Sequence, residues 1–100
     1  MGLHIHVLND VKEFFEGLSQ DAAAKIYAHL QLFQENHTEG LVIKSLKGKI
    51  KELIVKQYRI VFFTISNTGY IVDAFRKQSR KTPKRIIERA EEIYRVISGI

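Results

Sequence analysis

The spacing of apolar side chains changes along this chain, and the changes predict the order of its elements. Residues 3–8 alternate apolar and polar positions, which is typical of a half-buried strand. Two stretches with helical spacing follow; Asn9 or Asp10 is expected to cap the first, and Ser19 opens the second. The break near Gly17 between them therefore predicts a helical hairpin.

β-Forming residues dominate the second half of the chain, which ends in one amphipathic segment. Ile50–Val55 and Tyr58–Ile65 predict two strands, and the two residues between them favour an antiparallel hairpin. Turn-forming residues at 66–69 precede a returning strand at Tyr70–Arg76. From Pro83 to about Ile97 the apolar positions follow a helical period, so this segment is the predicted closing helix.

The predicted order β-α-α-β-β-β-α defines an α+β fold in a single domain spanning residues 1–100. We expect a small, mainly antiparallel four-stranded sheet, with the last three strands as a meander and the first strand at its edge. The helical hairpin and the C-terminal helix are expected to pack on one face. The other face would then stay partly open, as a hydrated basic surface that can hold a nucleic-acid strand.

Charge is distributed unevenly between the two halves of the chain. Residues 1–43 contain two basic and six acidic side chains, whereas residues 44–100 contain fourteen basic and five acidic ones. Such a basic half usually faces a polyanion, so we expect nucleic acid, although an acidic protein could use the same surface. No apolar run is long enough to cross a membrane, and there is no signal-peptide pattern and no cysteine. These features favour a cytoplasmic protein.

The start of the closing helix carries an unusual concentration of positive charge. Thr82 suits the N-cap and Pro83 suits the first helical position. Lys81, Lys84 and Arg85 crowd this end, and Arg85 stands where a capping box would place Glu. Because the helix dipole is already positive there, the cluster is unfavourable unless an anion shares it. The pattern predicts a phosphate site; a solvated basic turn is the plainer alternative.

A second group of cations points to the same chemistry. Arg59 begins the central strand, and Arg76 and Lys77 follow the end of the next one. Neighbouring antiparallel strands place the start of one beside the end of the other, so Arg59 and Arg76 are expected to lie side by side. Two neighbouring cations repel each other unless an anion lies between them. The alternative is a cross-strand ion pair between Arg59 and Glu52.

The four histidines all lie outside the basic half of the chain. His4 and His6 share one face of the first strand, but no cysteine or well-placed carboxylate completes a metal-binding set. There is also no glycine-rich phosphate loop and no nucleophile elbow. We therefore predict neither a metal site nor a small-molecule cofactor. An enzymatic site in this chain would use lysine, arginine, tyrosine or a carboxylate.

Four segments together resemble the phage-derived, HigB-like branch of the RelE/ParE toxin superfamily. They are Val11–Leu18, Leu46–Leu53, Tyr58–Phe63 and Ala74–Lys84. The most specific part is Tyr-Arg-Ile in the third segment, followed by Phe-x-Lys and Lys-Thr-Pro in the fourth. The resemblance implies the toxin of a bacterial type II toxin–antitoxin system. Such a toxin is a metal-independent, ribosome-dependent mRNA endonuclease that inhibits translation, and a helix-turn-helix, HigA-like antitoxin neutralises it.

The resemblance also implies a set of site residues. The 2′-hydroxyl of the RNA attacks the adjacent phosphate, so cationic side chains must stabilise charge on the phosphoryl oxygens. Arg59 and Lys77 match family positions and are expected to do this, while Lys49 or Lys51 would transfer a proton or position the substrate. The expected catalytic residues are Arg59, Lys77 and Lys51, and the expected RNA- and phosphate-binding residues are Lys49, Lys56, Arg76, Arg80, Lys81, Lys84 and Arg85.

One departure from the family pattern bears on this set. The family often has Glu-Leu-Arg before Tyr-Arg, whereas this chain has Glu52-Leu53-Ile54 and therefore lacks that arginine. Two further functions remain compatible with the same scaffold, because a fold does not fix a function. One is a non-enzymatic, ParE-like inhibitor of gyrase, and the other is a basic RNA-binding module without toxicity.

Overall fold

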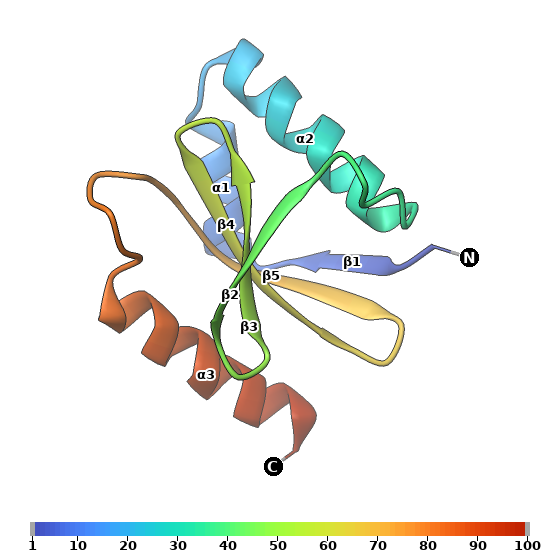
Figure 1. The fold of residues 1–100 in the computed structure, drawn as a ribbon, viewed down its shortest axis with the longest axis vertical. Coiled ribbons are helices and arrows are strands. Elements are labelled where there is room, and N and C mark those ends of the chain that lie inside the picture. The colour runs from blue at the N-terminus through green and yellow to red at the C-terminus, as the bar shows by residue number, and fades with distance from the viewer. Residues whose placement is uncertain (1, 100) are drawn as a thin grey trace.

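The computed structural model describes residues 2–99, which form one sheet and three helices (Figure 1). In this part of the chain the elements are β1 (His4–Val7), α1 (Asn9–Glu16), α2 (Gln20–Gln34), β2 (Val42–Lys47), β3 (Ile50–Val55), β4 (Tyr58–Ile65), β5 (Thr68–Arg76) and α3 (Lys84–Ser98). The strand order across the sheet is β1-β5-β4-β3-β2. β1 pairs with β5 in parallel, and every other neighbouring pair is antiparallel.

The predicted α+β class and the edge position of the first strand are confirmed, but the strand number is wrong. The sheet has five strands within residues 2–99 rather than four, because β2 was not predicted. β2 forms the outer edge of the sheet, and nearly all of its residues are exposed. Since neither face of this strand is well buried, its sequence lacks the apolar alternation by which a strand is recognised.

Helices cover both faces of the sheet, contrary to the expectation of a single covered face. In β4, Ile60 and Phe62 pack with the core formed by α1 and α2. The intervening Val61 and Phe63 pack instead with Ile86 and other residues of α3. In Figure 1, α2 and α3 accordingly lie on opposite sides of the strands. The continuous apolar run at residues 60–63 is typical of a strand that is buried on both faces.

Arg89 of α3 connects three elements on the side of β5. Its Nη2 donates to Asp10 Oδ2 of α1 at 2.8 Å, and its Nη1 donates to the Val72 carbonyl at 2.8 Å and to Asp73 Oδ2 at 3.3 Å. Burial raises the pKa of the Asp73 carboxyl above its usual range, although the Ala74 N–H and Arg89 act against this. The contacts fix α3 and α1 against the same strand.

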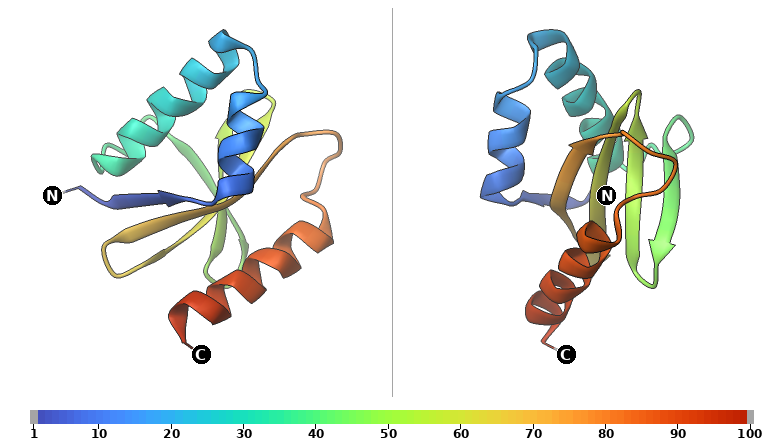
Figure 2. Two further views of the ribbon diagram at one scale, coloured as in Figure 1. Left: turned by 180° about the vertical axis from the view of Figure 1, so that it is seen from behind. Right: turned by 90° about the vertical axis from the view of Figure 1, so that its left-hand side faces the viewer.

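The covering by α3 is incomplete, and this leaves a site at one end of the sheet. α3 packs over Ile50, Val61 and Phe63, while Glu52 and Arg59 lie on the same face nearer the β3–β4 turn. The 77–83 connection leaves the end of β5 as an irregular loop before α3 begins (Figure 2). No helix in residues 2–99 has the length and apolarity needed to cross a membrane.

Candidate active site

Basic side chains gather around a small cavity where β3, β4 and β5 meet the 77–83 connection. This cavity, which we call the cationic cavity, has a volume of about 120 Å³. Five of its lining residues are basic and one is acidic; the lining comprises Lys44, Glu52, Ile54, Arg59, Phe75, Lys77, Ser79, Arg80, Lys81 and Thr82. Such an excess of positive charge around one hollow suits a phosphate group.

Strand register explains why Arg59 and Lys77 line the same cavity. Arg59 lies opposite Phe75 in the β4–β5 pair, so the two side chains share a face of the sheet. The Lys77 N–H donates to the Gln57 carbonyl at 2.7 Å, which continues the strand pairing beyond the end of β5. Lys77 is two residues after Phe75 and therefore returns to the same side as Arg59.

The Arg59 guanidinium is held in place but keeps a free donor group. Its side chain is only 12% exposed, and its Nη1 donates to the carbonyls of Lys56 and Tyr58 at 2.9 and 3.0 Å. Its Nε lies 4.0 Å from Glu52 Oε1, at the limit of an ion pair. Nη2 has no hydrogen-bond partner among residues 2–99. No polar side-chain atom in these residues is both fully buried and unpaired, so Nη2 reaches solvent. A ligand oxygen in the cavity can accept from it.

Glu52 is the buried carboxylate of the cavity. The residue is 4% exposed, and its Oε2 accepts a hydrogen bond from the Thr82 hydroxyl at 2.7 Å. This bond spans thirty residues of sequence and fastens the 77–83 connection to β3. A carboxylate so placed must be hydrogen-bonded or paired, since burying an isolated charge is costly. Both Glu52 oxygens are therefore oriented, one by Thr82 and one beside Arg59.

The predicted capping role of Thr82 is wrong. Pro83 is the N-cap of α3, and no side chain caps this helix end. The Thr82 hydroxyl is committed to Glu52 instead, a contact that no local pattern could reveal. Lys84 and Arg85 become the first two helical residues, so Arg85 does not occupy the capping-box position. The first turn contains no acidic residue, as the sequence indicated.

The 77–83 connection has its own local contact. The Ser79 hydroxyl donates to the Lys81 carbonyl at 2.9 Å, which bends the chain around Arg80. Arg80 and Lys81 are exposed, yet both line the cationic cavity. The bend therefore brings two further cations to the hollow that holds Arg59.

Arg76 does not lie beside Arg59, contrary to expectation. The β4–β5 register places Arg76 opposite Tyr58, one residue away from the pair formed by Arg59 and Phe75. A shift of one residue moves a side chain to the other face of a sheet. Arg76 and Arg85 instead line a neighbouring cavity, which shares Phe75 and Ser79 with the cationic cavity.

The other predicted site lysines also lie outside the cationic cavity. Lys51 pairs with Phe62 and therefore faces the α2 side of the sheet, opposite to Arg59. Lys49 lies at the far end of β3, in a hollow beside Tyr94. Lys56 is in the β3–β4 turn with a positive φ of 56°, and Lys84 is exposed at the start of α3. Lys44, which does line the cationic cavity, was not predicted because it lies on the unpredicted strand β2.

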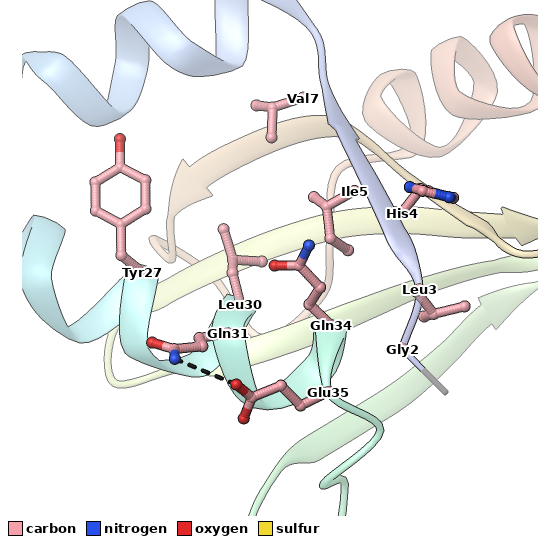
Figure 3. A pocket seen from close by; sticks show the side chains of 10 residues that line it. All are labelled: Gly2, Leu3, His4, Ile5, Val7, Tyr27, Leu30, Gln31, Gln34 and Glu35. Atoms are coloured by element: carbon pink, nitrogen blue, oxygen red, sulfur yellow. Dashed lines mark hydrogen bonds between the residues drawn. The ribbon is translucent and has the colours of Figure 1, made fainter.

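A larger cavity lies elsewhere and has a different character. It measures about 910 Å³ and lies between β1 and α2 (Figure 3). Ile5 and Leu30 contribute apolar surface, while Gln31 donates to Glu35 at 3.3 Å within its lining. No lysine or arginine lines this cavity. The smaller cationic cavity is therefore the better candidate for a phosphate.

The fold matches that of a chain in a solved RelE–RelB complex. A chain of the crystal structure of the archaeal RelE–RelB complex from Pyrococcus horikoshii OT3 superposes with a TM-score of 0.69 at 11% sequence identity. The match covers 81% of this chain and 100% of that chain. At this identity the likeness concerns the fold alone, and it defines the present protein as one with the RelE fold.

The family follows from the sequence itself. Residues 13–95 match the family described as phage derived protein Gp49-like (DUF891), and the chain belongs to this family. No curated protein matches the chain. Together, the family and the fold confirm the resemblance to the phage-derived branch of the RelE/ParE superfamily.

Proposed function

We propose that this protein is the toxin of a bacterial type II toxin–antitoxin system and cuts mRNA on the ribosome. The observation that carries the proposal is the cationic cavity, where Arg59, Lys77 and Lys81 surround a buried glutamate. Transfer of a phosphoryl group between two oxygens of one RNA chain needs positive charge around the phosphate and groups that move two protons. The lining of this cavity offers both.

Arg59 and Lys77 would hold the scissile phosphate. The free Nη2 of Arg59 and the ammonium of Lys77 donate to its non-bridging oxygens, whose charge increases in the transition state. Arg59 is well suited to this role because two backbone carbonyls fix its guanidinium before the substrate arrives. A preorganised donor gains more than one that must reorient.

Glu52 would accept the proton of the attacking 2′-hydroxyl. Among the described residues it is the one carboxylate that lines the cationic cavity, and a carboxylate oxygen can act as a general base. Thr82 engages Oε2, which leaves Oε1 as the accepting oxygen. Because Lys49 and Lys51 lie elsewhere, this assignment replaces the role in proton transfer expected for them.

Lys81 would supply the second proton. As the 2′-oxygen forms its bond to phosphorus, the bond from phosphorus to the 5′-oxygen breaks, and the Lys81 ammonium protonates this leaving oxygen. The products are a 2′,3′-cyclic phosphate on the upstream fragment and a 5′-hydroxyl on the downstream one. Glu52 then releases its proton to solvent, and Lys81 takes up a proton from solvent.

We propose two macromolecular partners in the cytoplasm besides mRNA. The excess of basic residues beyond residue 43 suits the ribosome, whose surface is rich in phosphate. The RelE of similar fold was crystallised in complex with RelB, which supports an antitoxin partner for this chain. Following the HigB-like resemblance, we propose that this antitoxin is a HigA-like, helix-turn-helix protein.

Expression of the protein without its antitoxin tests the proposal. Wild type should arrest growth and yield cut mRNA, whereas Arg59→Ala and Glu52→Gln should do neither. Lys51→Ala is the matched control, because it removes a basic residue from the other face of the sheet and should leave the arrest intact. Arrest with intact mRNA and damaged DNA would support a ParE-like gyrase inhibitor instead. An arrest that Arg59→Ala and Glu52→Gln do not weaken would contradict the assigned site.

A further inference from the structure

A second cavity adjoins the cationic cavity and has not been given a role. It measures about 520 Å³, and we call it the aromatic cavity; it is lined by Phe14, Phe75, Arg76, Gln78, Ser79, Pro83, Arg85 and Ile86. Phe75 and Ser79 line both cavities, so the two hollows are neighbours. An RNA chain bound in one would therefore pass close to the other.

The aromatic cavity exists because β5 is longer than its outer neighbour. β1 pairs with β5 only as far as Val7 opposite Ile71, and the five residues from Val72 to Arg76 have no strand on that side. α1 contributes Phe14 to the space thus left, and the beginning of α3 contributes Arg85 and Ile86. Figure 2 shows α1, the end of β5 and the start of α3 around this region.

The two aromatic residues are supported from behind. Phe14 packs edge-on against Tyr58, with their ring centroids 6.3 Å apart, and is half-buried. Phe75 is also half-buried and packs against the core beneath α3. Each ring thus packs against the protein on one side and still contributes surface to the cavity. A planar group entering the cavity meets a rigid apolar wall.

The charge of the lining restricts what the cavity can hold. Arg76 and Arg85 are exposed, and no acidic residue lines the cavity with them. A simple anion would use the two guanidinium groups but not the aromatic rings. A nucleotide uses both, because its base stacks on aromatic rings and guanidinium planes while its phosphate binds cations. Gln78 adds an amide that can hydrogen-bond a base edge.

We propose that the aromatic cavity is a subsite for a nucleotide that adjoins the scissile phosphate in single-stranded RNA. Its base stacks against Phe14 and Phe75, and its phosphate binds Arg76 and Arg85. This inference rests on the proposed function, which assigns the scissile phosphate to the neighbouring cationic cavity. It gives Arg76 and Arg85 a role on the substrate although neither lies beside Arg59.

Binding of an RNA that cannot be cut tests the subsite separately from cleavage. The probes are a fully 2′-O-methylated RNA of about ten nucleotides, which lacks the attacking hydroxyl, and an abasic oligonucleotide of equal length and charge. Phe14→Leu should weaken binding of the base-bearing probe about tenfold and leave the abasic probe unaffected. Arg76→Gln and Arg85→Gln should weaken binding of both probes. Arg95→Gln is the matched control, because Arg95 is an exposed arginine of α3 beside a different hollow.

The outcomes separate this inference from the proposed function. If binding of the base-bearing probe depends on Phe14 but the protein never cuts mRNA, the subsite is supported and the proposed enzymatic activity is refuted. If mRNA cleavage depends on Arg59 but the protein binds both probes equally, or binds neither, the subsite is overturned and the proposed function is not. If Phe14→Leu lowers the melting temperature, the two arginine variants decide, since exposed side chains can be replaced without disturbing the core. Equal effects of Arg85→Gln and Arg95→Gln would overturn the subsite as well.

Discussion

Replacing Thr82 by valine tests the contact that closes the candidate site. Valine has nearly the shape of threonine, so the change removes the hydroxyl without leaving a hole. The Glu52 side chain is 5% exposed and accepts this hydroxyl at 2.7 Å, so its Oε2 would lose its donor within the protein. A hydrogen bond to a charged group contributes about 1.5–3 kcal/mol, and we expect the free energy of unfolding to fall by this amount. That is a large fraction of the roughly 5–15 kcal/mol that stabilises a typical domain.

Urea unfolding followed by circular dichroism measures this loss, and two further variants isolate its cause. Thr82→Ser keeps the hydroxyl and should retain most of the stability. In the double variant Glu52→Met/Thr82→Val both partners are apolar. Its loss of unfolding free energy should therefore be clearly smaller than the sum of the losses in Glu52→Met and Thr82→Val alone. A loss below about 0.5 kcal/mol for Thr82→Val, the scatter of surface substitutions, would refute the argument.

Three further changes test other parts of the account. Lys84→Glu should stabilise the free protein by about 0.3–1 kcal/mol in urea unfolding, because it places a negative charge at the positive end of α3; a loss of stability would reveal an ion pair at Lys84. Burial raises the pKa of Asp73, so its contribution to stability is full below the pKa of the unfolded chain and is lost as pH rises through the folded-state pKa. Between about pH 3 and pH 7, wild type should therefore lose stability relative to Asp73→Asn, and parallel unfolding curves would contradict this. RNA binding should weaken steeply with salt, since neutralised phosphates release counterions; affinity that is constant between low and physiological salt would contradict a phosphate interface.

Local patterns predicted the elements that are buried. The bounds of β3 and β4 agree with the sequence, because their apolar residues sit between short turns. The Ser19 hydroxyl accepts from the Ala22 N–H at 3.2 Å, as expected for the cap of α2. The expected cap of α1 at Asn9 or Asp10 is wrong, because Leu8 is its N-cap and no side chain caps it. β2 was not predicted because an exposed edge strand has little alternation of apolar and polar residues. The placement of α3 on the opposite face was not predicted because an apolar stripe on a helix does not indicate which face of the sheet the helix covers.

The family resemblance predicted Arg59 and Lys77 as site residues, and both line the cationic cavity. Their common side follows from the β4–β5 register, which pairs Arg59 with Phe75, two residues before Lys77. Arg76 was misplaced because the register of two strands cannot be obtained from their sequences to one residue. The bond between Thr82 and Glu52 depends on tertiary structure, which overrode a good local capping signal. The assignment of Glu52 as the proton acceptor likewise required knowing which carboxylate enters the cavity.

The most direct test of the central claim is the chemistry of the RNA ends made on ribosomes. Purified protein is added to ribosomes carrying a defined mRNA, and the termini of the fragments are analysed. Wild type should give a 2′,3′-cyclic phosphate upstream and a 5′-hydroxyl downstream, and Lys51→Ala should give the same. Arg59→Ala should leave the mRNA whole. An mRNA that stays intact with wild type, or that Arg59→Ala cuts equally well, would contradict the claim that the cationic cavity is an RNA-cleaving site.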